Sequence, residues 1–273
     1  MTSSVVPVST ETPADAVPSD PSVPSDPSVP SDPSVPSDPA VVRPFTEEAW
    51  ERIAGWRDAV EHMPFVRALA DGSLPAEAFA FYLAQDAAYL REYSRVLARA
   101  AQGAPDPAAQ GFLARSSVTA LEVETALHRD WLGAHAGFAA GDVAAVEPSP
   151  VTAAYTGHLH AAASGSYAEA VAALLPCYWL YAHVGSVLVD LAGRRPGGLA
   201  GHPYATWIGT YGDEAFQEST RQARRLADEA ARWVSPDERR RMLRAFEISS
   251  VHEYLFFEQG LTAPAWPTPP VLT

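Results

Sequence analysis

From residue 46 onward, apolar side chains recur every three or four residues, and this spacing restricts the chain to helices that pack against one another. Glycine and proline separate the periodic stretches, as in DGSLP, GAPDP, EPSP and RRPGG. No stretch shows the alternation of apolar and polar residues that is typical of strands. The pattern predicts an all-α bundle with helices over residues 46–63, 75–102, 107–132, 150–163, 166–192, 203–232 and 236–259.

Both ends of the chain lack this periodicity. Residues 18–41 repeat the hexapeptide PSDPSV, with PSDPAV as the fourth copy. Proline fixes φ and removes a backbone donor, and Ser and Asp offer no apolar surface, so residues 1–43 are predicted to be a disordered Pro/Ser/Asp tail. Helices are expected to begin near TEEAW, with Thr46 as the cap. The folded domain is then expected over 44–262, followed by a Pro-rich tail over 263–273.

The charged residues and the lone cysteine exclude several classes of function. The net charge is −14 and all 19 basic residues are arginine. This argues against a nucleic-acid partner, and the absence of lysine excludes Schiff-base enzymes and P-loop nucleotide sites. One cysteine cannot form an internal disulfide or a multi-cysteine zinc site. With no signal-peptide pattern and no run of about 20 apolar residues, we expect a cytoplasmic protein without membrane contact.

The second predicted helix carries a polar stripe. Its members are spaced by about one or two helical turns, at Tyr82, Asp86, Tyr89 and Tyr93. Aromatic walls beside an acceptor carboxylate suit a flat ligand that bears an amino group. A solvated surface is the alternative, and a separate leucine face is expected to serve the core, at Leu83, Leu90 and Leu97.

Two later helices each offer one reactive group. Cys177 and Tyr181 share a face, and Pro176 is expected to kink the helix and favour a thiolate at the next turn. A buried hydrophobe is the ordinary alternative for a single cysteine. Glu253 shares a face with two phenylalanines, so its pKa is expected to be raised by an apolar pocket.

A metal centre is a competing use for acidic residues on helices. Glu124 and His128 have the i, i+4 spacing of metal ligands. A di-iron centre needs more Glu and His ligands from other helices, and the cysteine helix adds only His183, which faces away from Cys177. No metal is therefore expected, and the Glu–His pair is expected to support structure.

Seven segments, in order, resemble the TenA family, which is known as thiaminase II or aminopyrimidine aminohydrolase. The resemblance covers roughly residues 64–257 and includes PFVRALADGSLP, FYLAQDAAYL, EVETALHRDWL, PSPVTAAYTGHL, LLPCYWLYAHVG, GHPYATWIGTYGDEAF and ISSVHEYLFF. It implies a haem-oxygenase-like helical fold. The family pattern departs at Phe257, which stands where a tryptophan is usual.

The resemblance also implies roles for individual residues. The nucleophile would be Cys177 and the acid would be Glu253. Pyrimidine binding would fall to Asp86, Tyr89, Tyr155, Tyr181 and Tyr211. In the implied mechanism the ring lies between Tyr89 and Tyr155, the Cys177 thiolate adds to ring carbon C6, and Glu253 protonates a ring nitrogen.

The implied reaction is hydrolysis of 4-amino-5-aminomethyl-2-methylpyrimidine, or of thiamine, to 4-amino-5-hydroxymethyl-2-methylpyrimidine, within thiamine salvage. It requires no cofactor, and the partners implied are the small-molecule substrate and further copies of the chain in a homotetramer. The sequence leaves open which substrate is physiological. Two other readings also stay open, namely a haem-oxygenase-like oxidase, resembling the pyrroloquinoline-quinone synthases or di-iron relatives, and a pyrimidine-binding protein without activity.

Overall fold

The computed structural model describes residues 43–135, 146–195 and 197–268, with the side chains of 123–135 left out of the description. All of its regular elements are helices, which confirms the predicted all-α class for this part of the chain. They are α1 (Phe45–Arg52), α2 (Ala54–His62), α3 (Pro64–Asp71), α4 (Ala76–Gln102), α5 (Pro107–His135), α7 (Pro150–Ser164), α8 (Tyr167–Gly193), α9 (Ala205–Gly212), α10 (Glu214–Ala231) and α11 (Pro236–Thr262). The predicted N-terminal tail, 1–43, lies outside the described residues except for Arg43, whereas residues 263–268 of the predicted C-terminal tail are described and form no helix.

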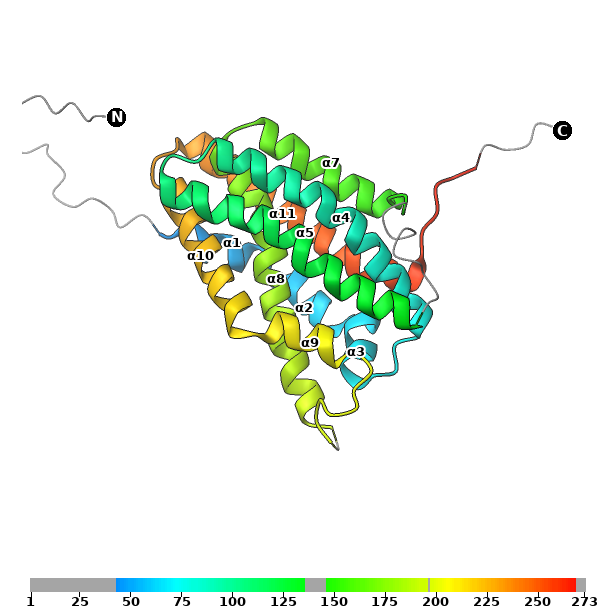
Figure 1. Cartoon of the computed structure of the whole chain (residues 1–273). Coiled ribbons are helices and arrows are strands. Elements are labelled where there is room, and N and C mark those ends of the chain that lie inside the picture. The colour runs from blue at the N-terminus through cyan, green and yellow to red at the C-terminus, as the bar shows by residue number, and fades with distance from the viewer. Residues whose placement is uncertain (1–42, 136–145, 196, 269–273) are drawn as a thin grey trace, which may run out of the picture. The chain divides into compact units, whose positions relative to one another are not determined.

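Helix α8 runs through the middle of the bundle (Figure 1), where it packs against α3, α7, α9, α10 and α11. Helix α4 lies between α5 and α7, and it also contacts α8 and α11. By length and apolar composition α8 alone among the described helices could cross a membrane, contrary to the expectation that no segment is apolar enough. Because 78% of its apolar window is buried inside the protein, it is a core helix.

Serine side chains fix the starts of three long helices. Ser149 accepts a hydrogen bond from the Thr152 backbone N–H at 3.1 Å at the start of α7. Ser166 caps α8 and Ser235 caps α11 in the same way, each at 3.2 Å. Such caps satisfy backbone N–H groups that have no partner within the helix, so the local sequence sets where each helix begins.

The expected cap at Thr46 is wrong. Helix α1 begins at Phe45 without a side-chain cap. The backbone N–H and the hydroxyl of Thr46 instead each donate to a carboxylate oxygen of Asp228 in α10, at 2.9 Å. A partner 182 residues away, unseen in the local sequence, takes the hydroxyl that capping would have used.

Two predicted helices are each divided in the structure, and one helix was not predicted. The stretch 46–63 breaks at Ile53, and 203–232 breaks at Asp213, whose carboxylate caps α10 through the Ala215 N–H at 2.5 Å. Helix α3 lies where only a connection was expected, and it ends at Gly72 with φ of 75°. That left-handed conformation suits glycine and stops the helix.

Helix α4 is buried on every side along its centre, contrary to the expectation of one core face and one functional face. Residues 82–90 are all buried, because four other helices surround this part of α4. Asp86 is consequently only 3% exposed. A carboxylate so far from solvent requires polar partners or a ligand, which favours a functional site over a surface.

Candidate active site

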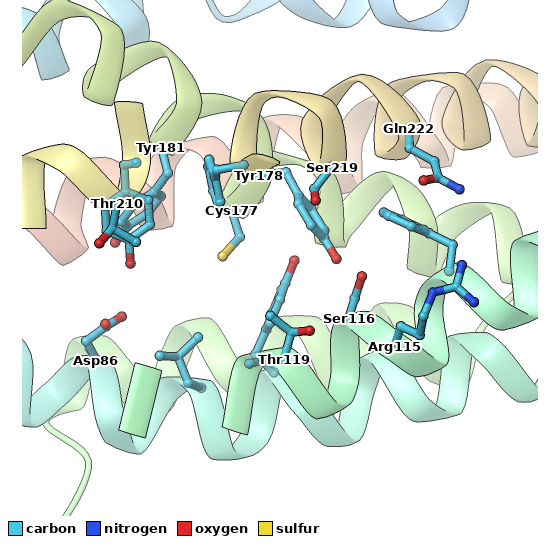
Figure 2. A pocket seen from close by; sticks show the side chains of 16 residues that line it. Asp86, Arg115, Ser116, Thr119, Cys177, Tyr178, Tyr181, Thr210, Ser219 and Gln222 are labelled. Atoms are coloured by element: carbon cyan, nitrogen blue, oxygen red, sulfur yellow. The ribbon is translucent and has the colours of Figure 1, made fainter. Parts of the chain in front are cut away.

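A cavity of about 350 Å³ lies among α4, α5, α8, α9 and α10. Figure 2 shows the Cys177 sulfur and the Asp86 carboxylate pointing into the same space from opposite walls. Tyr181 and Tyr211 also line it. The tertiary structure therefore brings together four of the seven predicted site residues around a space of ligand size.

Cys177 lies in the middle of α8, directly after Pro176, and the helix continues through the proline. The backbone before it is held from outside the helix, since the Tyr93 hydroxyl donates to the Leu174 carbonyl at 3.0 Å. Burial, and then the charges of Glu253 and Asp86, raise the pKa of the Cys177 thiol well above its usual value. The direction of this shift is opposite to the lowered pKa that the expected thiolate requires, although hydrogen bonds from Tyr89 and Tyr93 lower the pKa in part.

Glu253 lies on α11 and is 1% exposed. The Tyr155 hydroxyl donates to its Oε1 at 2.5 Å. Burial and the charge of Asp86 raise the pKa of Glu253, the Tyr155 hydrogen bond lowers it, and the result is about 8. The raised pKa predicted from the apolar surroundings is confirmed, so this carboxyl group carries a proton at neutral pH and can deliver it.

The rings of Tyr89 and Tyr155 touch each other behind the cavity. Their centroids are 4.9 Å apart with planes inclined by 31°, which is the spacing of two rings in direct contact. A ring inserted between Tyr89 and Tyr155 would require these two rings to move apart. Neither residue lines the cavity. Stacking of a pyrimidine between these two rings stays a prediction, and the cavity itself lies on the Cys177 and Asp86 side.

The opposite end of the aromatic wall consists of Tyr181 and Tyr211, whose centroids are 5.0 Å apart. The hydroxyls of Tyr181 and Tyr82 share a hydrogen bond of 2.8 Å, which fixes the Tyr181 side chain. Phe257 packs behind it, 5.2 Å from the Tyr181 ring and parallel to Tyr82 at 5.9 Å. Phe257, which stands where the family usually has a tryptophan, is fully buried. It packs behind the aromatic wall and does not line the cavity.

Gly185 lets α9 approach α8 closely enough to place Tyr211 at the cavity. A Cβ at Gly185 would lie 2.5 Å from the backbone oxygen of Tyr211, a distance that forces α9 to move. Replacing Gly185 by alanine is expected to destabilise the fold by about 1–3 kcal/mol and to weaken ligand binding through the displaced tyrosine. Thermal unfolding and ligand titration would measure both effects.

Gly193 provides the matched control on the same helix, because a Cβ there meets no atom within 4 Å. Gly193→Ala is expected to leave both quantities unchanged or to stabilise the protein slightly. Equal behaviour of the two variants would show that the close approach of α9 is not needed for the site.

The sequence interpretation missed the part of the cavity beyond Cys177. This part is lined by Phe112, Arg115, Ser116, Thr119, Tyr178, Phe216, Ser219 and Gln222. The sequence gives little indication that these residues form a site, because short polar residues and one arginine are common on the exposed faces of amphipathic helices. Only the placement of α5 and α10 on opposite sides of the cavity gives them a shared position.

The described residues contain no group of three or more His, Cys, Asp or Glu side chains that could hold a metal ion. The side chains of Glu124 and His128 lie outside the described part of the chain. The Nε2 atom of His183 forms a hydrogen bond of 2.6 Å with Oε1 of Glu61. The His183 ring also packs edge-on against Trp50. It serves packing between α8 and α2.

Comparison with known proteins gives a consistent match over the bundle. The family model described as TENA/THI-4/PQQC matches residues 50–263. The chain is 35% identical over 224 residues to the aminopyrimidine aminohydrolase of Bacillus subtilis, covering 81% of this chain and 92% of that protein. It is 39% identical over 224 residues to the thiamine biosynthesis multifunctional protein ThiED of Corynebacterium efficiens, covering 82% of this chain. The chain spans only 29% of that larger protein.

Solved structures repeat the arrangement of helices. The TenA homologue protein from P. horikoshii OT3 superimposes with a TM-score of 0.72 at 26% identity, covering 81% of this chain and 99% of that one. A domain from Shewanella denitrificans, described as having a heme oxygenase-like fold, superimposes with a TM-score of 0.63 at 15% identity, covering 81% of this chain and 94% of that one. The predicted haem-oxygenase-like bundle is confirmed.

Proposed function

Because the chain belongs to the TENA/THI-4/PQQC family, we propose that it is an aminopyrimidine aminohydrolase of thiamine salvage. It converts 4-amino-5-aminomethyl-2-methylpyrimidine, and also thiamine, to the 5-hydroxymethyl compound. The observation that carries the proposal is one cavity that holds a thiol and a buried carboxylate, backed by a carboxylic acid that is protonated at neutral pH. The 35% identical relative named for this activity is matched over nearly its whole length.

The pyrimidine binds on the inner side of the cavity, between Asp86 and the two tyrosines Tyr181 and Tyr211. Asp86 accepts hydrogen bonds from the 4-amino group and the adjacent ring edge, and the aromatic rings cover the flat faces. Tyr89 and Tyr155 do not line the cavity, and the Tyr155 hydroxyl orients Glu253 through a hydrogen bond. Each acidic side chain thereby has a separate task, recognition for Asp86 and proton transfer for Glu253.

Catalysis uses Cys177 as the nucleophile. Its sulfur forms a bond to ring carbon C6, Glu253 gives its proton to a ring nitrogen, and Glu253 then takes the proton of the thiol. The electron pair of the ring next expels the group on the 5-methylene, and the C–N bond breaks with its pair going to the departing nitrogen, which leaves as ammonia from the protonated amine or as the neutral thiazole. Water adds to the methylene carbon and loses a proton. Departure of the Cys177 thiolate from C6, with transfer of the ring N–H proton to that thiolate, restores the aromatic ring and the free thiol. No cofactor takes part in these steps.

Product analysis tests the proposal directly. The protein is mixed with 4-amino-5-aminomethyl-2-methylpyrimidine and, separately, with thiamine, and the products are identified by mass spectrometry. Formation of the hydroxymethyl compound and ammonia from the first substrate is expected. The ratio of kcat/KM for the two substrates separates salvage from thiamine breakdown. No product from either would overturn the proposal and favour an oxidase or a carrier.

The role of Asp86 predicts a loss of affinity. Asp86→Ala is expected to weaken binding of the hydroxymethyl product by about 1–3 kcal/mol, because the amino group loses a buried acceptor. Calorimetric titration measures the change. Asp86→Asn keeps the size of the side chain and is expected to bind nearly as poorly. An affinity equal to that of the unaltered protein in both variants would remove Asp86 from the pyrimidine site.

We further propose, from the family resemblance alone, that the protein works in the cytoplasm as a homotetramer. Light scattering during size-exclusion chromatography measures the mass, and a chain of 29.2 kDa is expected to elute at about four times that value. A monomer would contradict this expectation without affecting the reaction proposed above.

A further inference from the structure

The cavity extends beyond what an aminopyrimidine needs. From Asp86 it passes Cys177 and continues between α5 and α10 to Arg115 and Gln222, as Figure 2 shows. Of its sixteen lining residues, Asp86 is the one acid and Arg115 is the one base. The cavity is therefore polarised, with a carboxylate beside the pyrimidine site and a guanidinium at the far end.

Arg115 is available for a ligand. Arg115 is exposed and forms no ion pair with any residue in the described ranges, whereas the exposed Arg95 and Arg221 each pair with a glutamate. The Arg115 Nη1 lies close to Gly111, one turn earlier on α5. A Cβ at Gly111 would come within 3.1 Å of this nitrogen. A guanidinium without a carboxylate partner, placed at a cavity mouth, is a typical site for an oxyanion.

The side chains around Arg115 supply further donors. Ser116 and Thr119 project from α5, and Ser219 and Gln222 project from α10 on the opposite wall. Between them lies the Tyr178 hydroxyl, which interacts with the side chains of Ser116 and Tyr93. The outer end of the cavity therefore offers hydroxyl and amide groups beside the Arg115 guanidinium, a combination that suits a polar ligand group.

We propose that this outer end binds a phosphate group carried by the leaving portion of the substrate. The inference rests on the proposed function, and it assigns the substrate class as aminopyrimidines whose 5-methylene substituent ends in a phosphate monoester. The amino-bearing ring binds at Asp86, the bond that breaks lies beside Cys177, and the phosphate accepts hydrogen bonds from Arg115 and the hydroxyls of both walls. Water supplies the oxygen on the methylene carbon, and the phosphorylated group leaves with the electron pair of the broken C–N bond.

Thiamine and its monophosphate ester test this assignment, since they differ only in the phosphate. The measured quantity is kcat/KM for the monophosphate divided by kcat/KM for thiamine. Arg115→Gln is expected to lower this ratio by about tenfold or more, because a charge-assisted contact to phosphate is lost. Arg99→Gln on α4 removes the same charge from an exposed helix position outside the cavity and is expected to keep the ratio of the unaltered protein.

The outcomes separate this inference from the proposed function. If the aminomethylpyrimidine is hydrolysed but the ratio is the same in Arg115→Gln as in the unaltered protein, the phosphate assignment is wrong and the hydrolase stands. If Arg99→Gln lowers the ratio equally, the net charge of the protein, and not the outer end of the cavity, determines the preference for the monophosphate, and the assignment is wrong. A Cys177→Ser protein that binds the monophosphate no more tightly than thiamine, by calorimetry, would also overturn the assignment.

Discussion

Replacing Cys177 by serine is expected to lower kcat for the aminopyrimidine by about a thousandfold or more, with substrate affinity within a few-fold of the original. The hydroxyl that replaces the thiol is a weaker nucleophile and has a higher pKa, and the burial that already raises the pKa of the thiol acts on it as well. The substitution nearly conserves volume, so the fold and the Asp86 contact persist. Single-turnover kinetics and calorimetric titration measure the two quantities.

The lone cysteine makes the covalent step visible. Because the chain has one Cys, any substrate adduct found by mass spectrometry of the intact protein belongs to Cys177. The unaltered protein is expected to show an adduct during turnover and the serine variant none. Turnover of the serine variant near the original rate would rule out nucleophilic catalysis by Cys177 and leave Glu253 to activate water.

Replacing Glu253 by glutamine is expected to reduce kcat by about 10²–10⁴-fold, because an amide cannot deliver the proton that the ring nitrogen needs. The reaction begins with the protonated acid, whose pKa is about 8. Activity of the unaltered protein should therefore hold below pH 8 and fall as the pH rises through that value. A pH profile of kcat/KM measures this limb, which should be missing in Glu253→Gln.

Tyr155→Phe provides the matched control for that assignment. The Tyr155 hydroxyl donates to Glu253 and lowers its pKa. Its removal is expected to shift the alkaline limb to higher pH while most of kcat is kept. A limb that stays at the same pH in both variants would show that another group titrates.

The sequence predicted the residues that line the cavity better than it predicted their environment. Cys177, Asp86, Tyr181 and Tyr211 were predicted as site residues and do line one cavity. The raised pKa of the thiol could not be predicted, because it depends first on burial in the packed bundle and then on Glu253 and Asp86, which lie 76 and 91 residues away in the chain. The contact between the Tyr89 and Tyr155 rings likewise depends on how α4 meets α7, which periodicity does not give.

The sequence by itself determined the helical class, most helix starts and the positions of the reactive groups along α4, α8 and α11. These follow from local rules, since a 3.6-residue period and serine or proline at helix starts act within a few residues. Only the tertiary structure decided that α4 is buried on all sides along its centre, that the cavity continues between α5 and α10, and that Arg115 lies at the opposite end of the cavity from Asp86. Burial and electrostatic coupling arise between elements far apart in the chain, so they exist only once the helices are packed.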